Sequence, residues 1–96
     1  MNQLVKPNGT RIDLPGSGEY SVDELQDLVD GYIAVEKVKD GFLVYDDDGA
    51  FKCKVFNIEA TKMVLDYKRS VDSKTADEWT GFVSGDAVLC EKVKVE

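Results

Sequence analysis

The spacing of apolar residues changes from helical to alternating at Gly31, and this change constrains the fold more than any other feature of the sequence. Before Gly31, four apolar residues recur at intervals of three and four, namely Val22, Leu25, Leu28 and Val29. Such spacing places them on one face of a helix. Residues 32–38 are instead rich in β-forming side chains and alternate. A chain with both periods needs a helix and a sheet.

The helix is predicted over Ser21–Asp30. Ser21 and Glu24 form a capping box, in which the Ser oxygen accepts the third helical amide and the Glu carboxylate reaches back. Asp23 and Glu24 also suit the positive end of the helix dipole. Gly31 stands where a left-handed residue commonly ends a helix.

Alternation and turn residues predict most of the other elements. Residues 4–6 and 11–14 flank the turn-rich Pro7-Asn8-Gly9-Thr10 and indicate an N-terminal hairpin. A three-stranded meander is predicted from residues 32–38, 42–45 and 50–56. In its last strand, Phe51, Cys53 and Val55 share one face, opposite Lys52 and Lys54.

The second half of the chain predicts a short helix and further strands. Asn57 is a suitable N-cap for a helix over residues 58–65. The polar residues 66–80 are typical of a long loop. Residues 82–83 and 87–90 indicate a final hairpin, which continues as an alternating strand over residues 91–96.

These elements predict one α+β domain over residues 1–96, because this length suits a single domain. We expect a curved, mostly antiparallel sheet with one or two short helices; a half-open barrel is the alternative. No apolar run is long enough for a signal peptide or a membrane span. We therefore expect a cytoplasmic protein that does not bind membranes.

The composition argues against the common catalytic chemistries. The chain has no histidine, which is the commonest general base and metal ligand. The turn Asp46-Asp47-Asp48-Gly49 lacks the spacing of an EF-hand, and Gly16-Ser17-Gly18 is too short to bind phosphate. We expect no enzyme and no catalytic residue, metal or cofactor. Cys53 and Cys90 are expected to be free thiols in the core.

The net charge of −7 is concentrated in the first half of the chain. Residues 1–48 carry eleven acidic and four basic side chains, whereas residues 49–96 carry eight of each. An acidic face is predicted from Asp23, Glu24, Asp27, Asp30, Asp40, Asp46, Asp47 and Asp48. Such a face either keeps the protein soluble or docks on a basic, nucleic-acid-binding surface of a partner protein. Direct nucleic-acid binding is disfavoured, because it depends on clustered Lys and Arg.

Trp79 and Arg69 lie in the segment predicted to be a loop. A tryptophan in a polar loop commonly anchors the loop to the core. Alternatively, Trp79 is an exposed hot spot, or stacks on a base while Arg69 binds phosphate. The sequence leaves both interpretations open.

Several motifs recur in one known family. They are Val29-Asp30-Gly31-Tyr32-Ile33 at the end of a helix, the acidic turn Asp47-Asp48-Gly49, the segment Phe56–Thr61, and Gly85-Asp86-Ala87-Val88-Leu89. The chain thereby resembles a small family of unknown function found in bacteriophages and bacterial mobile elements. Ala34 departs from the family's usual acidic residue, and residues 67–80 have no counterpart. The resemblance implies a mobile-element origin and transfers no catalytic residue.

Three hypotheses for function follow. The first is a phage or mobile-element protein that inhibits a host defence or nucleic-acid-handling protein through its acidic face. The second is a small-ligand binder that sequesters a nucleotide signal, with a pocket at an oligomer interface that involves Trp79 and Arg69. The third is a structural or assembly module, such as a homo-oligomer, with no ligand.

Overall fold

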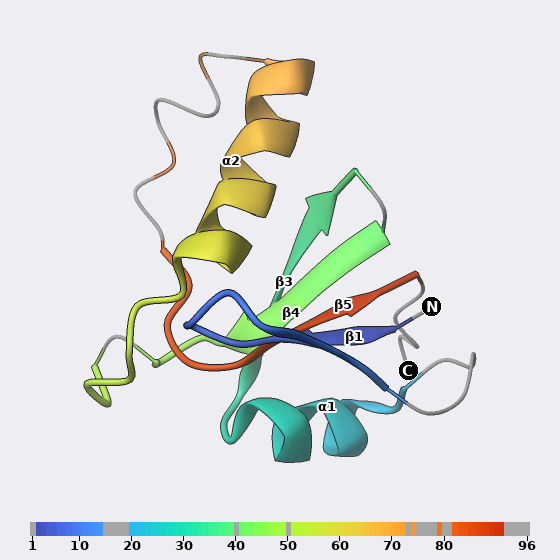
Figure 1. Ribbon diagram of the computed structural model, residues 1–96, viewed down its shortest axis with the longest axis vertical. Helices are drawn as coiled ribbons and strands as arrows, with labels where there is room; N and C mark the ends of the chain where they lie inside the picture. Colours follow the sequence, from blue (N-terminus) through green and yellow to red (C-terminus); the bar gives the residue numbers. More distant parts are fainter. Residues whose placement is uncertain are drawn as a thin grey trace.

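The protein forms a five-stranded antiparallel sheet with one helix on each face (Figure 1). The structure is a computed structural model that describes residues 2–14, 20–39, 41–49, 51–72, 74, 79 and 82–91. Its elements are β1 (Gln3–Val5), β2 (Arg11–Asp13), α1 (Val22–Val29), β3 (Ile33–Val38), β4 (Gly41–Asp46), α2 (Ile58–Val71) and β5 (Ala87–Cys90). The strand order is β2-β1-β5-β4-β3. The predicted α+β class is confirmed, and the sheet is open, with edges at β2 and β3.

The sheet separates two apolar cores because its central strands alternate. Ala87 and Leu89 of β5 pack in the core beneath α2, whereas Val88 and Cys90 pack in the core beneath α1. In β4, Leu43 and Val44 divide in the same way. All four residues of β5 are buried, since the strand is covered on both faces. The helices therefore lie on opposite sides of the sheet (Figure 1).

Helix α1 is confirmed, although its C-terminal cap differs from the prediction. Ser21 and Glu24 form the expected capping box. The left-handed residue is Asp30, with φ 58° and ψ 55°, rather than Gly31. Gly31 is required for another reason, because a Cβ atom there would lie 2.5 Å from the carboxylate of Asp46.

Helix α2 begins at the predicted cap but continues to Val71, so the prediction of a loop from Asp66 onward is wrong. The Asn57 side chain accepts the Ala60 amide as expected. The buried residues Ala60 and Val64 are followed on the same face by the half-buried Tyr67. This face contacts β3, so the polar residues 66–70 can extend a helix whose outer face is solvated.

Residues 51–56, the described part of the strand predicted over residues 50–56, do not form a strand. Residues 51–53 form a turn, and Phe56 alone makes an isolated bridge, with Ser84. The physical reason is that β4 already pairs with β3 on one side and β5 on the other. The segment therefore has no free edge of β4 to join, despite its alternating pattern.

The predicted final hairpin is also wrong. Strand β5 pairs with β1 and β4 instead of with residues 82–83. The Val83 carbonyl accepts the Asn57 amide at 2.8 Å, and the Val83 amide donates to Thr61 Oγ1 at 3.0 Å. These bonds hold Val83 against the start of α2. Residues 92–96 of the predicted last strand lie outside the described residues, as do residues 15–19.

Candidate interaction surface

A buried carboxylate organises the loop between β4 and α2, residues 47–57. Asp46 Oδ2 accepts Lys52 Nζ at 3.0 Å and Lys54 Nζ at 2.6 Å, and Oδ1 accepts the Asp48 amide at 3.0 Å. The Asp46 side chain has no exposed area. Burial by itself would raise the pKa of Asp46, but the bonds from Lys54, Lys52 and the Asp48 amide outweigh it and lower the pKa. Asp46 therefore stays ionised and holds the loop, which corrects its predicted place on the acidic face.

The same lysines cap the end of α1. Lys54 Nζ donates to the carbonyls of Val29 and Asp30, each at 2.8 Å, and Lys52 Nζ reaches the Asp30 carbonyl at 3.4 Å. An ammonium group has three donors, and those of Lys54 are all used, since the third acceptor is Asp46. Positive charge at this end of a helix also complements its dipole. The two cations of the loop are thus committed to contacts within the fold.

The remaining predicted carboxylates lie on α1 and in the turn after β4. We call this set the acidic surface; its exposed members are Asp23, Glu24, Asp27, Asp30, Asp47 and Asp48. Asp40 lies outside the described residues. Among the residues that the structure describes, none of Asp23, Asp27 and Asp47 forms an ion pair. Glu24 has a second role, because it accepts the Ser21 amide at 3.1 Å.

The turn after β4 lies beside the C-terminal end of α1. The Asp47 amide donates to the Tyr32 carbonyl, just after α1, at 2.8 Å. The hydrogen bond to Asp46 is the main cause that raises the pKa of Lys52, and the charges of Asp30 and Asp48 add to it. Both carboxylates are therefore close to one ammonium group. The helix and the turn contribute to one surface, in the lower part of Figure 1.

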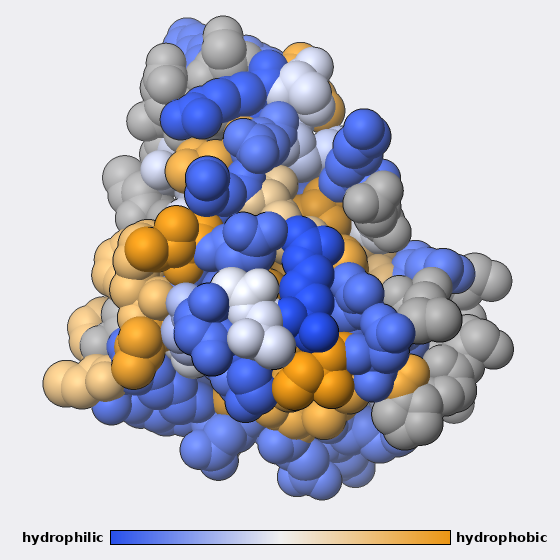
Figure 2. All heavy atoms as spheres, viewed as in Figure 1, coloured by the Kyte–Doolittle hydropathy of each residue, from blue (hydrophilic) through white to orange (hydrophobic). Residues whose placement is uncertain are grey.

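Next to this turn, apolar side chains of the loop, of the first residue of α2 and of Phe82 before β5 are exposed, and the sequence pattern does not indicate them as a site. We call them the apolar patch: Phe51, Val55, Phe56, Ile58 and Phe82. Phe51 is 89% exposed and Val55 is 70% exposed. The rings of Phe56 and Phe82 meet edge to face at 5.7 Å. Figure 2 shows apolar side chains gathered on the left of the molecule, where Figure 1 shows this loop.

The alternation of Phe51, Cys53 and Val55 is the available signal for the apolar patch, but it predicts one face of a strand that does not form. Cys53 is exposed, so its predicted place in the core is wrong. Cys90 is buried as predicted, and burial raises the pKa of its thiol to about 11. Because residues 51–55 form no strand, the alternating residues Phe51, Cys53 and Val55 are all exposed.

Arg69 and Trp79 do not share one role. Arg69 is exposed on α2. Trp79 is half-buried and packs against the core beneath α2, with Lys68 Nζ 5.7 Å from its ring centroid. The cation over this ring is Lys68 rather than Arg69. The contact of Trp79 with the core agrees with the interpretation that this tryptophan anchors its segment to the core.

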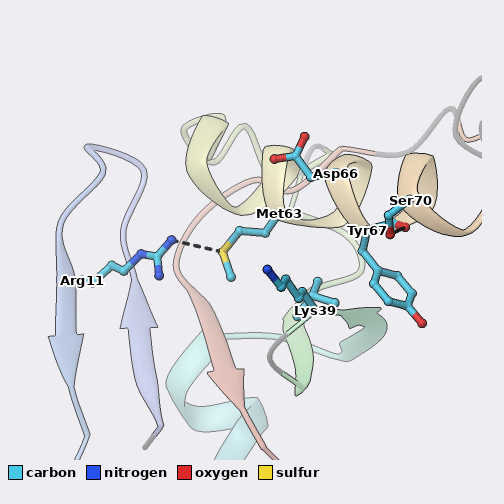
Figure 3. Close-up of a pocket in the computed structure, with 7 residues that line it drawn as sticks. Arg11, Lys39, Met63, Asp66, Tyr67 and Ser70 are labelled. Atoms are coloured by element: carbon cyan, nitrogen blue, oxygen red, sulfur yellow. Dashed lines mark hydrogen bonds between the residues drawn. The ribbon is translucent and has the colours of Figure 1, made fainter.

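A separate pocket of about 220 Å³ lies between α2, β2 and the β3–β4 turn. Arg11 extends from β2 to Glu59 Oε1 at 2.7 Å and to Met63 Sδ at 3.7 Å. Figure 3 shows Arg11 and Lys39 pointing toward Met63 from different elements. The pocket combines Lys39 and the Glu59-paired Arg11 with Asp66 and with the apolar Val38 and Met63.

Within the described ranges, no group of three acidic or cysteine side chains is arranged to hold a metal ion. Neither of the two described helices is long and apolar enough to cross a membrane. Comparisons with protein-family models, with curated proteins and with solved structures find no match to this chain.

Proposed function

We propose that this protein is a non-catalytic interaction protein that docks its acidic surface on a basic partner, and so inhibits a nucleic-acid-handling or defence protein. The observation that carries the proposal is that the ammonium groups of Lys52 and Lys54 bind groups within the fold, namely the Asp46 carboxylate and, for Lys54, the Val29 carbonyl. Because these two lysines bind Asp46 and the end of α1, the exposed carboxylates of α1 and the turn can attract positive charge on a partner. An origin in a phage or mobile element rests on the motif resemblance alone.

The test neutralises two carboxylates without changing side-chain size. A partner captured from a lysate at low salt is identified, purified and titrated against the wild type and the variant Asp23→Asn/Asp27→Asn. We expect the variant to bind about tenfold more weakly at low salt and to show a smaller salt dependence, because screening already weakens exposed charge pairs. Binding is measured by calorimetry or interferometry at several salt concentrations.

The matched control is Asp66→Asn/Asp72→Asn, which makes the same change in net charge at exposed positions toward the other end of the molecule. The asparagine at 72 keeps an acceptor for the Lys74 amide. The control is expected to bind like the wild type. Equal losses in both variants would mean that only net charge matters, which contradicts docking through the acidic surface.

A second candidate function is binding of a small anionic ligand, such as a nucleotide, and the observation that favours it is the pocket lined by Arg11, Lys39 and Tyr67. This site replaces the pairing of Arg69 with Trp79 considered above. A nucleotide that raises the melting temperature of the wild type but not of Lys39→Ala would favour this function. No shift with any nucleotide would exclude nucleotide sequestration.

A further inference from the structure

We infer that the apolar patch is the hot spot of the interface, and that it fits an apolar recess framed by Lys or Arg on the partner protein. This inference rests on the proposed function and adds a second contact to it. Contiguous exposed apolar side chains rimmed by polar residues commonly mark protein-binding sites. Aromatic residues are also enriched at the energetically dominant centres of interfaces.

The patch is held in one arrangement before any partner binds. The Lys54 amide donates to the Gly49 carbonyl at 3.1 Å, and the Gly85 amide donates to the Val55 carbonyl at 2.7 Å. The side chains of Lys52 and Lys54 fix the same loop to Asp46. A preformed loop loses less conformational entropy on binding, so its exposed side chains contribute more to affinity.

Cys53 adds a second sign that the loop conformation is specified. It has φ 59°, in the left-handed region that residues with a side chain seldom adopt. The ion pairs on either side of it, at Lys52 and Lys54, hold this conformation. The resulting turn places Phe51 and Val55 in solvent instead of on a sheet.

Charge favours a basic partner over a second copy of this chain. The exposed carboxylates Asp47 and Asp48 border the patch in the sequence, and the lysines of the loop are paired inward. A symmetric dimer through the patch would bring the two Asp47–Asp48 turns toward one interface, where like charges repel. A partner with Lys or Arg around an apolar recess would instead pair with them.

The experiment compares two variants of exposed residues. Phe51→Ser/Val55→Ser removes apolar area from the patch, and Val71→Ser is the matched control, because Val71 is 68% exposed and lies at the end of α2. The purified partner is titrated against each variant at low and high salt. We expect the double variant to bind about thirtyfold more weakly at every salt concentration, and the control to bind like the wild type.

The two proposals fail in different ways. Unchanged affinity in Phe51→Ser/Val55→Ser overturns the apolar hot spot, while the salt dependence of Asp23→Asn/Asp27→Asn still tests the acidic surface. Phe51→Ser alone, at a side chain 89% exposed, repeats the test if the double variant melts early. A wild-type dimer that the double variant dissociates, seen by analytical ultracentrifugation, would assign the patch to a second copy and overturn the inference. Recovery of no basic protein at low salt contradicts both proposals.

Discussion

Replacing Asn57 with alanine is expected to lower the free energy of unfolding by about 3 kcal/mol, since a net hydrogen bond contributes about 1 kcal/mol and an N-cap about the same. Asn57 is fully buried. Its Nδ2 donates to the carbonyls of Val5 and Gly85, each at 2.9 Å, and its Oδ1 accepts the Ala60 amide at 3.0 Å. Alanine removes all three hydrogen bonds, two of which are buried, and leaves their backbone partners without this side chain.

The loss is measured by urea denaturation followed by circular dichroism. Asn8→Ala is the control, because Asn8 is exposed and its Oδ1 accepts only the nearby Thr10 amide, at 2.9 Å. We expect the control to lose less than about 1 kcal/mol, as is usual for a surface hydrogen bond. Similar losses in the two variants would show that Asn57 does not join β1, α2 and the segment before β5.

Replacing Asp46 with asparagine is expected to cost about 2 kcal/mol, less than a fully buried ion pair, because the Lys52 side chain is 43% exposed and Lys54 is 19% exposed. Asparagine keeps an acceptor for the Asp48 amide but removes the charge that holds both lysines. The loop should then loosen, so the same variant is expected to bind the partner more weakly. Chemical denaturation gives the first effect and titration with the partner gives the second.

The effect of Asp46 should also depend on pH. The folded pKa lies below the ordinary value of 3.8, so the carboxylate stabilises the folded state above that value. This contribution is lost as the pH falls through the folded pKa. The difference in melting temperature between wild type and Asp46→Asn is therefore expected at neutral pH and should shrink in acid. A difference that stays constant down to acidic pH would contradict an ionised Asp46 in the fold.

Local signals were sufficient to predict the first half of the fold. The capping box at Ser21 and Glu24 places α1, and the turn around Asn8 and Gly9 places the hairpin of β1 and β2. Residues close in sequence make these contacts, so their pattern is readable directly. Asn57 also marks the start of α2, because capping involves only the first helical turn.

Long-range pairing explains what could not be predicted. Strand β5 lies between β1 and β4, far from both in the sequence, and nothing in its composition specifies those neighbours. Its position closes the free edge of β4 and turns the expected strand at Phe51 and Val55 into an exposed loop. The carboxylates of α1 and the turn indicate the acidic surface, but the burial of Asp46 depends on Gly31 and on the lysines of a loop whose path the pattern does not predict.

The most direct test of docking through one continuous surface is a titration of isotope-labelled protein with the purified partner, followed by amide chemical shifts. We expect the largest changes at residues 23–30, 47–48 and 51–58, with residues 66–70 of α2 unchanged. Changes confined to the pocket at Arg11, Lys39 and Tyr67 would contradict it.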